Sequence, residues 1–158
     1  MNIHQEHTFH FEKTKIYQAF RDPKKLEKVL PLVTAIDEVH PNQYQVQAAL
    51  VAGPITGRLS ASLQIENENP SDHFDVTVRY QHLLGNVFGD FSVSFYTIDK
   101  RTTIAKIKGE VVMTRLLKAV AYKIQPETIS GLTRQFFTRM ETMLETNNIM
   151  PSKYSILT

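Results

Sequence analysis

The chain contains no cysteine and no tryptophan among its 158 residues. Without cysteine it cannot form disulfides, bind a metal through thiolates or use a cysteine nucleophile. Proteins that stay in a reducing interior commonly lack disulfides. Residues 1–7 contain neither the basic segment nor the apolar core of a secretory signal. We therefore expect a cytoplasmic protein.

Charge of one sign and long apolar runs are also missing. Eighteen basic and 16 acidic side chains leave a net charge of +2, and the bases are scattered along the chain. Nucleic-acid-binding proteins usually gather their bases in one stripe, so we expect no nucleic-acid partner. No apolar run approaches the roughly 20 residues of a membrane span. The length predicts one domain, which we place at residues 1–147, with a C-terminal tail at 148–158.

The middle of the chain alternates apolar and polar residues with a period of two, which is typical of strands with one buried face. Strands are predicted at residues 2–11, 33–40, 44–52, 55–66, 74–81, 87–95 and 105–113. Short turns such as Pro41-Asn42 and Gly53-Pro54 separate them, and this predicts an antiparallel meander. Gly57, Gly89 and Gly109 lie on the inward rows, where they either bend the sheet or make room for bulky side chains.

Two short helices and one long helix are predicted around these strands. The short helices cover residues 13–20 and 24–29, and Asp22-Pro23 separates them. The long helix covers residues 115–145, and Pro126 is expected to kink or break it. Only this helix is long enough to cover the apolar face of the sheet. We therefore predict an α+β fold in which a curved antiparallel sheet of about seven strands wraps around a long C-terminal helix.

Three local motifs carry a resemblance to a known family. They are the stretch Ile16–Leu26 with its Asp22-Pro23 pair and closing Pro31, the hairpin Gly53-Pro54-Ile55, and the pair Phe136-Phe137. Together with the order of elements, they resemble the START-like helix-grip (SRPBCC) superfamily. More narrowly, they resemble the CoxG family of carbon monoxide dehydrogenase subunits. The resemblance covers about Ile3 to Leu144, and its motifs are structural rather than catalytic.

The resemblance implies a cavity between the sheet and the last helix that holds a hydrophobic, lipid- or quinone-like molecule. In bacterial members it also implies an accessory role for a molybdenum-containing dehydrogenase, so a partner oxidoreductase is expected. The sequence departs from the family at Leu83–Asn86, where it is less glycine-rich, and at the tail 151–158. That tail is shorter than the membrane-directed extension of some members, which argues against a stable membrane anchor.

The apolar inward rows and the facing side of the long helix supply the candidate ligand site. Its predicted lining is Leu59, Leu63, Phe74, Val76, Val78, Tyr80, Phe91, Val93, Phe95, Leu132, Phe136 and Met140. Ligand sites are largely apolar with a few placed polar groups, and the hydroxyls of Tyr44 and Tyr80 and the His7 ring are the polar groups expected here. The same side chains are equally suited to a close-packed core, and the sequence leaves both interpretations open.

Catalytic groups are missing from the inward rows, which contain no Asp, Glu, Lys, Arg or Ser. We therefore expect binding rather than catalysis, and no cofactor. His4, His7 and His10 recur every three residues, a spacing that alternates between the faces of a strand. We expect that they cannot converge on one metal ion, and the sequence has no helical histidine pair at metal-binding spacing.

Two other functions remain open. One is an enzyme of the polyketide cyclase or hydrolase type on the same fold, and the other is a protein-interaction module without a cavity. The basic and apolar stretch 115–123 and the loop Leu83-Leu84 suit a transient contact with a membrane surface or a partner protein. An ordinary amphipathic helix with a solvated face has the same pattern.

Overall fold

The structure, a computed structural model, describes the backbone of residues 1–52 and 55–157, and their side chains except at 50–52, 55–56, 120–121 and 147–157. The predicted hairpin residues Gly53 and Pro54 lie outside the described part of the chain. The elements are β1 (Asn2–Phe9), α1 (Lys13–Phe20), α2 (Pro23–Val29), β2 (Val33–His40), β3 (Gln43–Ala52), β4 (Ile55–Asn69), β5 (His73–His82), β6 (Gly85–Asp99), β7 (Thr102–Met113), α3 (Leu117–Lys123) and α4 (Pro126–Leu157).

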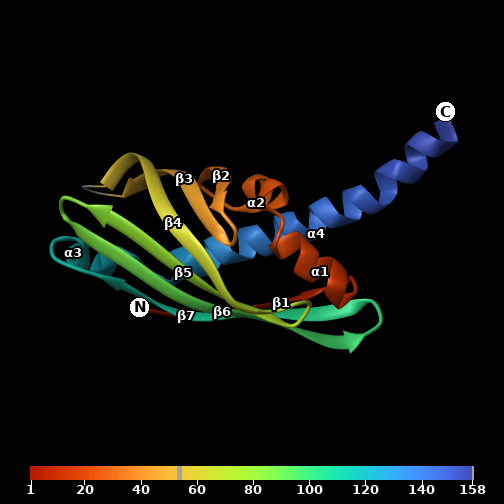
Figure 1. The fold of residues 1–158 in the computed structure, drawn as a ribbon, viewed down its shortest axis with the longest axis horizontal. Helices are drawn as coiled ribbons and strands as arrows, with labels where there is room; N and C mark the ends of the chain where they lie inside the picture. The colour runs from red at the N-terminus through yellow and green to blue at the C-terminus, as the bar shows by residue number, and fades with distance from the viewer. Residues whose placement is uncertain (53–54, 158) are drawn as a thin grey trace.

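The strands form one antiparallel sheet in the order β1-β7-β6-β5-β4-β3-β2. Strands β2 to β7 follow one another as a meander, and β1 then pairs along β7, with Asn2 opposite Glu110 and Phe9 opposite Thr103. The sheet is curved, and α4 crosses its hollow side, as Figure 1 shows. The predicted helix-grip architecture is confirmed.

The two short helices begin and end where the sequence predicts. The Asp22 carboxylate accepts a hydrogen bond from the Lys24 backbone N–H at 3.0 Å, and Pro23 occupies the first turn of α2. Both features are typical of a helix start. The two helices lead from β1 to β2, and the segment from Phe20 to Val33 borders the interior of the fold.

Pro126 divides the predicted long helix, as expected. Helix α3 ends at Lys123, and α4 begins at Pro126, where the missing proline N–H costs no hydrogen bond. Helix α4 then continues to Leu157, over the segment for which a tail was expected. The described backbone stays helical through Pro151, although a proline inside a helix removes one backbone hydrogen bond.

Gly89 and Gly109 both lie beside the Phe91 ring. Phe91 pairs with Gly109 across β6 and β7. A Cβ at Gly109 would lie 2.2 Å from the Asp90 backbone oxygen, and one at Gly89 would lie 2.7 Å from the Phe91 ring. Of the two interpretations of these inward glycines, the structure supports space for a bulky side chain. Gly57 differs, because its φ of +113° is a conformation that glycine adopts readily.

An aromatic core fills the end of the sheet beneath α1. The Phe20 ring lies 5.9 Å from Phe9, 5.1 Å from Phe95 and 5.4 Å from Phe136, and Phe9 lies 5.9 Å from Phe137. The edge-to-face geometry of these pairs is favourable beyond the area they bury. None of the helices, within the portion described, has the length and hydropathy needed to cross a bilayer.

Candidate functional site

A pocket of about 450 Å³ lies between the hollow face of the sheet, helix α4 and the α1–α2 segment. We call it the inner pocket. All seven strands contribute to its lining, mostly with aliphatic and aromatic side chains. Leu132, Thr133 and Phe136 of α4 cover it, and Phe20, Arg21, Pro23, Leu26, Leu30 and Pro31 close one side.

Eight of the predicted site residues line the inner pocket: Leu63, Phe74, Val76, Val78, Phe91, Val93, Leu132 and Phe136. The period of two in the strands brings the first six to one face of the sheet. The helical period of α4 brings the last two to the facing side. Their role in binding a ligand stays a prediction.

The other four predicted residues lie outside the inner pocket. Phe95 and Met140 are buried in the aromatic core, where α1 packs between the sheet and α4. Leu59 packs beside Leu117 in a second cluster beneath α3. The Tyr80 ring stacks with His82 at a centroid distance of 6.0 Å. The alternation of residues predicted which face of each strand is buried. It did not predict which buried residues border the pocket, because that depends on where α1 and α3 pack along the sheet.

Residues 20–33 contribute to the pocket wall, which the sequence patterns did not indicate. Arg21 is the only charged residue of the described lining, and it comes from the end of α1 rather than from an inward row. Helical spacing at Phe20 and Leu26 signals buried faces, but not which part of the sheet these faces meet. The part of the sheet that α1 and α2 cover is decided by tertiary packing.

Arg21 organises a polar cluster at the edge of the inner pocket. Its Nε donates to the Glu68 carboxylate at 2.6 Å, one terminal nitrogen donates to the Tyr44 hydroxyl at 3.2 Å, and the other donates to the Asn42 side-chain oxygen at 2.8 Å. The Tyr17 hydroxyl also donates to Glu68. The cluster connects α1 with strands β3 and β4 and presents Arg21 and Tyr44 to an otherwise apolar space.

The side chains of this cluster keep the same charge states around neutral pH, because their contacts shift their pKa values away from it. The hydrogen bond from Arg21 lowers the pKa of the Glu68 carboxyl. Burial by itself would lower the pKa of Arg21, but hydrogen bonds with Glu68 and Tyr44 outweigh it, so that its pKa is raised. Burial raises the pKa of the Tyr44 hydroxyl, which stays protonated at neutral pH. The edge of the pocket therefore carries a permanent cation and a neutral hydroxyl.

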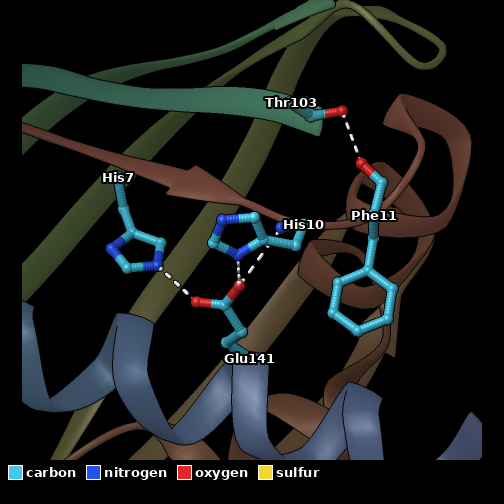
Figure 2. Close-up of polar contacts among 5 residues, drawn as sticks. All are labelled: His7, His10, Phe11, Thr103 and Glu141. Carbon is cyan, nitrogen blue, oxygen red and sulfur yellow. Dashed lines mark hydrogen bonds and ion pairs between the residues drawn. The ribbon is translucent and has the colours of Figure 1, made fainter. Parts of the chain in front are cut away.

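A second polar cluster fastens α4 to β1, outside the inner pocket. In Figure 2, the Glu141 carboxylate of α4 lies between His7 and His10. One oxygen contacts His7 Nε2 at 2.9 Å, and the other contacts His10 Nδ1 at 2.6 Å and the His10 backbone N–H at 3.1 Å. Nearby, the buried Thr103 hydroxyl donates to the Phe11 carbonyl at 2.9 Å. Burial raises the pKa of the Glu141 carboxyl, but the hydrogen bonds from His7 and His10 outweigh it and lower the pKa overall.

The expectation that the N-terminal histidines point apart is wrong for His7 and His10. Strand β1 ends at Phe9, so the alternation of faces no longer applies at His10, and the chain turns it toward Glu141. His4 is exposed and is not part of this cluster. The carboxylate occupies the space between the two rings. Among the described side chains, no group of three or more ligands is arranged to hold a metal ion.

Comparison with known proteins identifies a family pattern that spans the fold. The family model for CoxG, a carbon monoxide dehydrogenase subunit, matches residues 7–144 of the chain. This range extends from β1 to the buried part of α4 and includes both polar clusters and the whole lining of the inner pocket except Ile3. No match is found among curated protein sequences.

Several solved structures share the architecture at low sequence identity. A conserved protein from Geobacillus kaustophilus superimposes with a TM-score of 0.82 at 13% identity, over 92% of this chain and 96% of its own. A protein from Mycobacterium smegmatis gives 0.68 at 15% identity, over 92% of each chain. A protein from Chromobacterium violaceum gives 0.65 at 16% identity, over 91% and 96%. Such identities establish a common fold and nothing finer.

Proposed function

Because the chain belongs to the CoxG family of carbon monoxide dehydrogenase subunits, we propose that it binds and carries or senses a hydrophobic small molecule in the inner pocket. The observation that carries this proposal is the pocket itself. Its volume of about 450 Å³ lies within the range of about 300–1,000 Å³ that is common for small-molecule sites. A fully packed core would leave no such space.

The lining supports a ligand with an apolar body and one oxygen-bearing end. Apolar side chains from the sheet and α4 surround most of the space, while Arg21 and Tyr44 lie together at one edge. A carbonyl or carboxyl oxygen of the ligand would be stabilised beside the Arg21 cation. Lipid-like and quinone-like molecules both have this form. An oxidoreductase that exchanges such a molecule is the partner we propose.

The cluster of Arg21 and Tyr44 is also the one feature that favours the enzyme alternative, because two polar groups with perturbed pKa values meet at a pocket. We propose binding instead, since the guanidinium is already paired with Glu68 and the Tyr44 hydroxyl already accepts from it. The alternative of a cavity-free interaction module is disfavoured by the volume of the pocket.

The test is to fill the pocket. Val76 points into it from β5, and Leu132 points into it from α4. Val76→Phe and Leu132→Phe should each weaken the uptake of a dansyl-labelled fatty acid or of menadione at least tenfold, as measured by fluorescence titration. Because the added atoms enter free space, the free energy of unfolding should change by less than the roughly 1–3 kcal/mol typical of an overpacked core.

Thr77→Phe is the matched control, because Thr77 is the next residue of the same strand and faces the opposite side of the sheet. It should leave uptake unchanged. Equal uptake by all three variants, or no uptake by the unmodified protein, would end the proposal. Independently of these variants, native mass spectrometry of freshly purified protein would detect any molecule that copurifies.

A further inference from the structure

The end of the molecule that carries α3 exposes three large apolar side chains. Leu83 is 93% exposed, Tyr122 is 90% exposed and Leu116 is 65% exposed. Leu83 lies in the turn between β5 and β6, and Figure 1 places this turn at the same end of the sheet as α3. We call these three residues the apolar tip. Single exposed apolar residues are ordinary, whereas a group of them at one end marks an interaction site.

The backbone holds the apolar tip in place. The Leu116 N–H donates to the Leu84 carbonyl at 3.0 Å, and the Asn86 N–H donates to the Thr114 hydroxyl at 2.9 Å. Gly85 allows this contact, because its φ is +144° and a Cβ there would lie 2.0 Å from the Thr114 carbonyl oxygen. The turn that contains Leu83 and the segment before α3 therefore form one unit.

The residues of the apolar tip are not core residues that lack a covering element. Helix α3 inserts the fully buried Leu117 into the end of the sheet, where it packs against Leu59, Leu84, Val87, Met113 and Ile124. Leu116 and Tyr122 remain exposed although α3 is already anchored. Their exposure is thus a property of the folded molecule.

Basic residues outnumber acidic residues in the segments that carry the apolar tip, and the nearest acidic residues in sequence, Asp90, Glu110 and Glu127, lie just outside these segments. Residues 79–89 and 111–126 contain Arg79, Arg115, Lys118 and Lys123 but no Asp or Glu. These four bases exceed the net charge of +2 of the whole chain, so the rest of the protein is net acidic. Arg115, Lys118 and Lys123 are exposed, and none of them forms an ion pair within the described part of the chain.

We propose that this face docks on a lipid bilayer surface that carries acidic head groups. Leu83, Leu116 and Tyr122 enter the head-group region, and the neighbouring lysines and arginines lie against the lipid phosphates. Exposed leucine and tyrosine beside basic side chains suit the membrane–water interface, because its acyl side is apolar and its head-group side is charged and hydrated. Docking of this kind is reversible and weakens as salt screens the charges.

The docked orientation brings a second pocket to the membrane. This pocket has a volume of about 760 Å³ and lies between β1, β7 and the corner of α3 and α4, with Lys118, Tyr122 and Ile129 in its lining. Ile3 borders both this pocket and the inner pocket. A hydrophobic molecule would thus enter from the bilayer near Ile3. This route rests on the proposed function, whereas the docking itself does not.

The absence of tryptophan makes the orientation directly measurable. Tyr122→Trp introduces a single tryptophan at the apolar tip, and Tyr96→Trp introduces one in β6, at a residue that is 51% exposed. With vesicles of phosphatidylcholine mixed with phosphatidylglycerol, the emission of Tyr122→Trp should shift to shorter wavelength, and that of Tyr96→Trp should not. An unshifted Tyr122→Trp spectrum, or an equal shift for both variants, overturns the proposal.

Cosedimentation with the same vesicles tests the residues. The combined substitution of Leu83, Leu116 and Tyr122 by serine should reduce the bound fraction about tenfold or more. Serine at Val39, Tyr96 and Ile98, which are 51–58% exposed, is the matched control and should leave it unchanged. Serine at Arg115, Lys118 and Lys123 should remove the preference over pure phosphatidylcholine vesicles.

Vesicle binding that survives the serine variants of the apolar tip would place the lipid contact elsewhere and overturn the proposal. Absence of vesicle binding by the unmodified protein would overturn it as well and would favour a protein partner at this face. A double variant with Leu83→Ser and Leu116→Ser, which leaves the lining of both pockets unchanged, should lose docking but still take up the dansyl fatty acid from solution. Loss of vesicle binding with intact uptake therefore separates this inference from the proposed function. Vesicle binding by a protein that takes up no fatty acid would refute only the proposed function of the inner pocket.

Discussion

The two ends of the curved sheet are built in opposite ways. At the end beneath α1, the phenylalanines of the aromatic core pack together, and Glu141 fastens α4 to the residues at the end of β1. At the other end, Leu117 is the only fully buried member of a small cluster among the side chains that the structure describes, and three large apolar side chains face solvent. The inner pocket lies between these ends.

This difference indicates where the fold is held and where it is free to interact. Regions with few buried contacts open locally at a lower free energy than aromatic cores do. Binding surfaces are commonly drawn from such regions. We infer that the aromatic end fixes α4 over the pocket, while the α3 end serves exchange with the surroundings. Substitutions at both ends test the comparison.

The largest effect is expected at the aromatic end. Phe9 is fully buried and contacts Phe20 and Phe137, so Phe9→Ala should lower the free energy of unfolding by about 3–5 kcal/mol. Urea denaturation followed by circular dichroism measures this loss. The counterpart at the other end, Leu117→Ala, should cost less, near the lower limit of the roughly 2–5 kcal/mol that such truncations cost. Equal losses would contradict the proposed difference between the ends.

An intermediate effect is expected for Glu141→Gln. This change weakens the hydrogen bonds to His7 and His10 and should cost about 1–3 kcal/mol at neutral pH. Because folding lowers the pKa of Glu141, its stabilisation is complete above the unfolded pKa of about 4.3 and is lost as pH falls through the folded value. The difference between the two proteins should therefore shrink below about pH 4.

Glu145→Gln is the control for that measurement. Glu145 is exposed one turn further along α4, and its replacement should change stability by less than about 0.5 kcal/mol at any pH. A pH-independent difference for Glu141→Gln would show that the carboxylate does not act through its charge.

The smallest effect is expected for Leu116→Ser at the apolar tip. Leu116 is 65% exposed, so the free energy of unfolding should change by no more than about 0.5 kcal/mol. A loss as large as that of Leu117→Ala would mean that Leu116 belongs to the core, and its exposure would then not mark a binding face.

Local patterns were sufficient to predict most of the fold. The alternation over 55–66 and 87–95 predicted strands that the structure contains, and Asp22-Pro23 and Pro126 placed the helix breaks correctly. These predictions succeed because strand faces and proline geometry are set by neighbouring residues. The same patterns could not show that Arg21 reaches the pocket, or that His10 turns toward Glu141.

The sequence by itself therefore determined the elements, their order and the apolar face that each presents to the interior. Only the tertiary structure decided which part of that interior is filled and which is left as a pocket. The reason is that packing depends on how α1, α3 and α4 meet the sheet, through contacts between residues more than 100 positions apart, such as His7 with Glu141. A periodic pattern specifies which side of an element is buried, but it does not specify what lies opposite.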